Sequence, residues 1–151
     1  MDKKAALISL FSKIPIALQR YYFNLFAMGM KGLLTIGMLI ISNAFMTLAW
    51  YGHLKFGELK GLHKLGLVSI VLISWGLALF EYCFQVPANR IGYRENGGPF
   101  SLIQLKVIQE VITLVVFMIF TLLAFRNESI RWNHLLGFIF LILAVYFVFK
   151  K

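Results

Sequence analysis

Residues 65–86 read LGLVSIVLISWGLALFEYCFQV, a run of 22 residues whose only charged side chain is Glu81. An α-helix needs about 20 residues to cross about 30 Å of hydrocarbon, so this stretch can span a lipid bilayer. Three further stretches are also apolar and long enough to span, and they cover residues 33–54, 100–125 and 132–149. The alternation of a barrel strand is absent, so we expect all four spans to be helices.

The composition supports a membrane location. Apolar residues make up 60% of the 151 residues and charged residues only 14%, whereas charged residues make up about 25% of a soluble domain. We therefore predict an all-α integral membrane protein built as a four-helix transmembrane bundle. The net charge of +9 comes mostly from bases that flank the apolar runs, which favours anionic lipid headgroups over nucleic acid as partners.

The domain boundary falls near residue 30. We assign residues 30–151 to the transmembrane domain and treat residues 1–29 as an extension. Pro15 and several polar residues interrupt that extension, so it is either an amphipathic surface helix over about 15–26 or an upstream over-extension of the reading frame. Pro87 is expected to end the second span, and the glycines and proline at 97–99 predict a turn before the third.

The distribution of Lys and Arg predicts the orientation of the chain. With four spans, nine of these residues lie on the face of the two termini and five on the opposite face, which places both termini in the cytoplasm. A chain that starts at Met30 has five bases on each face instead. Such a chain is expected to insert in both orientations and to pair antiparallel.

Polar residues recur at helical spacing inside the spans. In the second span, Gln85 follows Glu81 by four residues and Asn89 follows by eight. The other candidates are Asn43 in the first span and, in the third span, Lys106, Gln109, Glu110 and Thr113, which the spacing places on one face. We expect these three helices to line a polar cavity, while the fourth faces lipid or a second copy of the chain.

Two carboxylates at membrane depth favour proton or cation chemistry. A charged side chain there costs at least about 2.5–3.5 kcal/mol, and a carboxyl group in a low-dielectric site can exchange a proton for a cation. Glu81 is the stronger candidate because no cation lies near it in its own helix, whereas Lys106 precedes Glu110 by one turn. In the alternative interpretation, Lys106 and Glu110 form a structural ion pair and Asn43 an interhelical hydrogen bond.

Enzymatic and metal chemistry have no support in the sequence. No phosphate-binding loop, nucleophile motif or metal-ligand spacing occurs, and the three histidines fall near predicted loops. We therefore expect a protein that is not an enzyme and has no metal or cofactor.

Several short segments of the sequence resemble a small bacterial membrane family of unknown function, which is grouped with the drug/metabolite transporter superfamily. They are SNAFMTLAWYGHL (42–54), SWG (74–76), FEY (80–82), QVPANRIGY (85–93), QLKVIQEVITL (104–114) and AVYFVF (144–149). The resemblance covers roughly residues 30–150. It implies a protomer similar to small multidrug resistance proteins, which work as antiparallel dimers in the inner membrane of bacteria.

The same resemblance limits what can be carried over. Those proteins hold an essential glutamate in helix one, where this chain has Asn43 and no carboxylate. We expect a small transporter or exporter of a cationic, amphipathic or lipid-like solute, which would work as a homodimer through helix four. The site residues would be Glu81, Glu110, Lys106, Gln85, Gln109 and Asn43. The alternative is a membrane scaffold or accessory subunit. A variant of the transporter hypothesis is a lipid flippase that requires a second small membrane protein.

Overall fold

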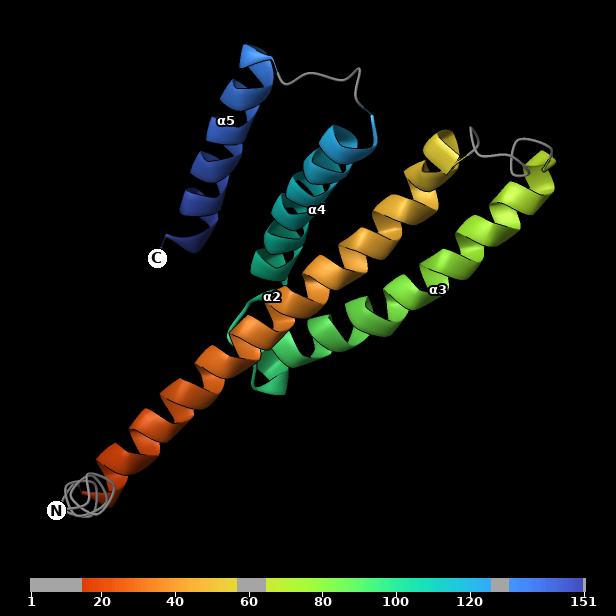
Figure 1. Cartoon of the computed structure of the whole chain (residues 1–151). Helices are drawn as coiled ribbons and strands as arrows, with labels where there is room; N and C mark the ends of the chain where they lie inside the picture. Colours follow the sequence, from red (N-terminus) through yellow and green to blue (C-terminus); the bar gives the residue numbers. More distant parts are fainter. Residues whose placement is uncertain (1–14, 57–64, 126–130, 151) are drawn as a thin grey trace, which may run out of the picture.

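The computed structural model describes residues 15–56, 65–125 and 131–150, which form four long helices without a strand. These are α2 (Ile16–Phe56), α3 (Leu67–Gly92), α4 (Leu102–Ala124) and α5 (Trp132–Phe149). Each contains a stretch long and apolar enough to cross a membrane. Helices α2 and α4 run in one direction, and α3 and α5 run in the other (Figure 1). The predicted all-helical, four-span architecture is therefore confirmed.

Helix α2 is longer than the sequence predicted. Its 41 residues run without interruption from Ile16 to Phe56, so the segment expected to form a separate surface helix continues into the first span. Pro15 lies immediately before the first helical residue, where the N–H that proline lacks is not needed. At about 1.5 Å per residue the helix measures about 61 Å, and even a 40° tilt cannot fit that length into about 30 Å of hydrocarbon. Part of α2 must therefore lie outside the hydrocarbon. The predictions for residues 1–14 and for the loops at 57–64 and 126–130 fall outside the described residues.

Helix α3 does not end at Pro87, and that prediction is wrong. The helix continues through Pro87 to Gly92, although proline has no N–H to donate to the preceding turn. The turn that follows is held by packing, because Ala88 is fully buried and Gly92 is buried against α2 and α4. Tertiary contact therefore maintains a turn that the local sequence disfavours.

Gly92 of α3 lies in close contact with both α2 and α4. A β-carbon built there would lie 2.7 Å from Thr35 Cγ2 and 2.9 Å from Leu105 Cδ2, so no side chain fits. On α2 the facing surface consists of Thr35, Leu39 and Ser42, all with no exposed area. Small residues at such contacts are typical of membrane helices, whose backbones approach closely where no large side chain intervenes.

The connection between α3 and α4 is tightly bonded. After a short 3-10 helix, η2 (Arg94–Asn96), the chain turns at Gly97, whose φ of 76° suits glycine. Five backbone hydrogen bonds of 2.8–3.0 Å join residues between 92 and 100, and Lys31 Nζ donates to the Gly97 carbonyl at 2.9 Å. Ser101 then begins α4 with a capping box that it shares with Gln104. The turn predicted at 97–99 is confirmed.

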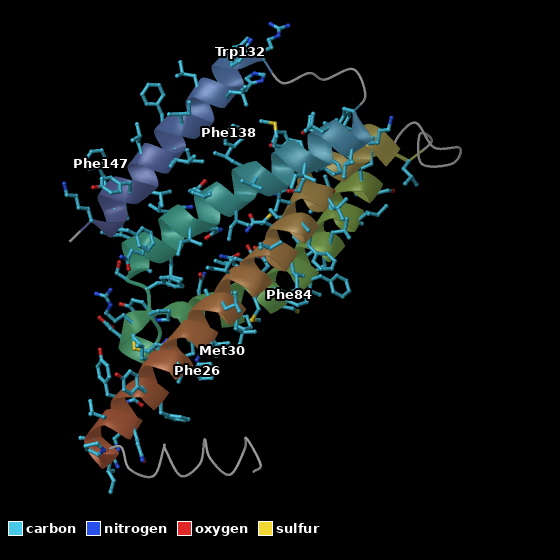
Figure 2. All side chains as sticks on the ribbon, turned by 60° about the vertical axis from the view of Figure 1, so that its left-hand side comes forward. Phe26, Met30, Phe84, Trp132, Phe138 and Phe147 are labelled. Carbon is cyan, nitrogen blue, oxygen red and sulfur yellow. The ribbon has the colours of Figure 1, made fainter. Side chains whose placement is uncertain are left out.

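Helix α5 is the least packed helix of the described chain. None of its residues is buried, and its main contacts are with α4. Aromatic side chains project along it, including Trp132, Phe138 and Phe147 (Figure 2). A helix this apolar and this exposed must be covered by lipid or by another protein surface.

Candidate functional site

The carboxyl group of Glu81 is buried near the middle of a membrane-spanning helix. Fourteen residues separate it from the start of α3, which is about 21 Å along the axis. Only 3% of the residue is exposed. Water and lipid headgroups are therefore out of reach of this carboxyl in the arrangement described.

Ser42 of α2 connects Glu81 to Gln85. Its Oγ lies 3.2 Å from Glu81 Oε1 and 2.8 Å from Gln85 Oε1, and all three residues are buried. The spacing of four residues brings Glu81 and Gln85 to the same face of α3, as the sequence predicted. We call these three residues the Ser42 cluster.

The Ser42 cluster has fewer donors than acceptors. The serine hydroxyl carries one proton, yet it faces two acceptor oxygens, and Glu81 Oε2 is buried without a hydrogen-bond partner among the described residues. An unpaired polar atom in a buried site costs about 1–3 kcal/mol. A proton on Glu81 would remove its charge from this buried site, and a donor group would pair Oε2.

Aromatic rings lie beside the cluster. Phe45 of α2 stacks on Phe80 and Phe84 of α3, with ring centroids 5.8 and 5.9 Å apart. Figure 2 shows Phe84 on the part of α3 that lies along α2. These stacked rings add an apolar contact between α2 and α3 in the same part of the helix pair as the cluster.

Asn43 joins α2 to α4 rather than to the Ser42 cluster. Its Nδ2 donates to the Leu39 carbonyl at 2.8 Å, and its Oδ1 accepts from Thr113 Oγ1 at 2.5 Å. Thr113 Oγ1 also lies 2.8 Å from the Gln109 carbonyl. The interhelical bond proposed for Asn43 in the alternative interpretation is thus present.

Lys106 and Glu110 lie apart from the Ser42 cluster. Their side chains form an ion pair one turn apart on α4, with Nζ and Oε1 at 2.5 Å, and they are 66% and 52% exposed. Leu105 and Thr113 lie on the packed side of α4. Successive residues of a helix point about 100° apart, so Lys106 and Glu110 lie on a different side of α4. The expectation that three helices line one polar cavity is therefore wrong for this pair. Gln109, which also lies on α4, is half-buried.

Ser42 is the site residue that sequence reasoning missed. A serine in an apolar helix is common and carries no charge, so it did not stand out beside Asn43. The available signal was its spacing, since Ser42 follows Thr35 by seven residues and both lie on the face of α2 that packs against α3.

A separate apolar cavity of about 690 Å³ lies between α4, α5 and the end of α2. Tyr51, Phe117 and Phe138 contribute aromatic surface, and Gly137 leaves open space where a side chain would stand. Besides Tyr51, two polar residues line it: Thr121, whose Oγ1 is buried with no partner among the described residues, and His134, whose Nδ1 accepts from the Arg131 N–H. The volume is within the range of 300–1,000 Å³ usual for small-molecule sites.

Comparison with known families identifies the family of the chain. Residues 35–149, more than half of the sequence, match the family described as "Putative member of DMT superfamily (DUF486)". The chain belongs to this family. Members of the drug/metabolite transporter superfamily are transporters rather than enzymes, and the four spanning helices agree with a multi-pass membrane protein. No curated protein and no solved structure matches the chain.

The two polar contacts of α2 predict a pattern of energetic coupling. Ser42→Ala and Gln85→Ala should destabilise the protein less together than the sum of the single changes, with a coupling of about 0.6–1.7 kcal/mol. Asn43→Ala with Thr113→Val should show coupling of the same size. The crossed pairs, Ser42 with Thr113 and Asn43 with Gln85, serve as controls and should couple by less than about 0.5 kcal/mol. Unfolding in mixed micelles measures all four cycles, and equal coupling in the crossed pairs would contradict the assignment.

Proposed function

We propose that the protein is a small membrane transporter in which Glu81 binds either a proton or the positive charge of the solute. The supporting observation is the buried carboxyl at mid-span whose Oε2 has no partner among the described residues. A carboxyl retained at this depth at such a cost is a functional candidate by default.

The hydrogen bonding of the Ser42 cluster supports a proton exchange. When Glu81 holds a proton, its O–H can donate to Ser42 Oγ while the serine donates to Gln85 Oε1, so the oxygens are better satisfied. When the proton leaves, the carboxylate needs a new cationic partner in a low-dielectric site. A cationic solute would supply that partner, so the two states would alternate.

Glu110 stands outside this proposed exchange. Its charge is already balanced by Lys106, and both side chains are more than half exposed. Gln85 and Ser42 would orient Glu81, while the hydrogen bond between Asn43 and Thr113 would hold α2 against α4.

Glu81→Gln should abolish coupled transport while leaving the fold intact, because the amide keeps the shape of the side chain but cannot exchange a proton. In proteoliposomes with a pH difference, we expect the uptake of ethidium, used as an amphipathic cation, to fall at least tenfold. Glu95→Gln, which removes an exposed carboxylate outside the spans, should keep the wild-type rate. The same melting temperature for both variants would separate loss of activity from loss of folding.

The alternative function, a membrane scaffold, makes the opposite prediction in this assay. The wild-type protein would then move no probe along the pH gradient, and Glu81→Gln would change only the stability or the assembly. A probe flux equal in the wild type and Glu81→Gln would also overturn the proton role.

The solute class is inferred from the cavity between α4 and α5. Its surface is mostly apolar, with aromatic rings and few polar groups, which suits the apolar part of an amphipathic or lipid-like molecule. The apolar body of such a solute would lie in this cavity.

Filling the cavity should weaken solute binding. Gly137→Leu places a side chain in open space within the cavity, so we expect the affinity for ethidium to fall about tenfold. Gly76→Leu is the matched control, because Gly76 of α3 also faces open space but does not line the cavity. Fluorescence titration in micelles measures both, and equal losses would rule out a specific role of the cavity.

We further propose that the protein acts as a homodimer through α5, in the inner membrane of a bacterium and with both termini in the cytoplasm when the chain starts at Met1. The support is an apolar helix without a buried residue, on which Phe140, Ile142 and Phe147 are each more than 60% exposed. The ratio of nine to five bases supports the orientation.

Compartment-specific reporters at the C-terminus test the antiparallel form of this dimer. A chain that starts at Met30 has no charge bias, so its reporters should give comparable signals on both sides of the membrane. The chain that starts at Met1 should report mainly from the cytoplasm. A cytoplasmic signal alone from both chains would exclude antiparallel pairing of identical copies.

A further inference from the structure

The end of the bundle where α3 finishes and α4 begins contains a second hollow, of about 370 Å³. Two cations line it, Arg90 and Lys106, and none of its lining residues is acidic. The remaining polar lining residues are Asn89, Tyr93, Asn96 and Gln109. We call this the Arg90 hollow.

Arg90 is the least committed cation of this hollow. Its side chain is exposed, and no described residue pairs with its guanidinium group; only its backbone carbonyl is used, as the acceptor for Asn96 Nδ2 at 3.1 Å. Lys106 in contrast is paired with Glu110. A guanidinium group presents several N–H donors in a plane, a geometry that matches the oxygens of a phosphate group.

The surrounding backbone holds the hollow in shape. Arg90 lies two residues before the end of α3, and the bonded connection from Gly92 to Phe100 follows directly. Lys31 ties this connection to α2 by its bond to the Gly97 carbonyl. The backbone around the hollow is therefore held in place before a ligand binds.

The depth of the hollow fits the phosphate layer of a bilayer. Arg90 is about 3 Å along the axis from the end of α3, and Lys106 is about 6 Å from the start of α4. Basic pockets between spanning helices at this level bind anionic headgroups. Tyr93 follows α3 at the same level, and the hydrogen bond of its hydroxyl with Glu95 raises the pKa of Tyr93.

We propose that the Arg90 hollow binds a phosphate group, with Arg90 as the main ligand and Lys106 and Gln109 as further donors. The binding brings Lys106 into contact with both the phosphate and Glu110. This site is separate from the Ser42 cluster, so it does not depend on proton-coupled transport.

Binding of short-chain phosphatidic acid tests the proposal without any transport assay. Calorimetric titration of the purified full-length protein in micelles should show binding of dioctanoyl phosphatidic acid and no binding of dioctanoylglycerol, which has the same chains without the phosphate. Arg90→Gln should weaken the binding at least tenfold, as expected for the loss of a charge-assisted hydrogen bond. Arg20→Gln removes the same charge elsewhere on the exposed surface and should change the affinity less than twofold.

A second variant guards against a fold defect in the first. Lys106→Gln combined with Glu110→Gln removes the ion pair without changing the net charge, and it should also weaken binding. Inorganic phosphate distinguishes the source of the group: competition at similar concentrations indicates a free phosphate, and no competition indicates a lipid headgroup. Equal losses in Arg90→Gln and Arg20→Gln, or no loss in either hollow variant, would overturn the proposal.

Discussion

Two consecutive polar residues of α2 determine how three of the helices meet. Ser42 reaches α3 through Glu81 and Gln85, and Asn43 reaches α4 through Thr113. Successive residues of a helix point about 100° apart, so one helix can serve two neighbours from adjacent positions. In hydrocarbon no water can replace these partners, so each polar side chain needs its neighbouring helix in place.

This constraint separates the polar residues into an inner and an outer group. The inner group is nearly free of formal charge apart from Glu81, and it depends on a serine hydroxyl and two amides. The outer group holds opposite charges on Lys106 and Glu110, which balance each other without being buried. The two charges are in contact, so each offsets the cost of placing the other within a spanning helix.

The sequence predicted the spans well because hydropathy is a property of long segments and averages over local detail. It failed where a single contact overrides a local preference. Pro87 breaks helices in isolation, yet the burial of Ala88 and Gly92 carries α3 past it. The spacing of three or four residues also predicted that Lys106 and Glu110 share one face of α4 with Thr113. Spacing does not show which part of such a broad face a neighbouring helix covers, so the exposure of the ion pair could not be predicted.

Ser42 shows a different limit. Its importance comes from what lies opposite it on α3, and a chain read residue by residue does not reveal that partner. The Arg90 hollow has the same origin, since Arg90 and Lys106 are sixteen positions apart and meet only because the connection between them folds back.

The unbroken length of α2 also makes it a mechanical lever. Ile16 lies 26 residues before Ser42, which is about 39 Å along a straight helix. If α2 turns as a rigid rod about the polar contacts at Ser42 and Asn43, and the connection bonded to Lys31 turns with it, a rotation of about 5° moves that distant end by about 3 Å. A small rearrangement around a buried carboxyl would thus be magnified into a displacement at the membrane surface.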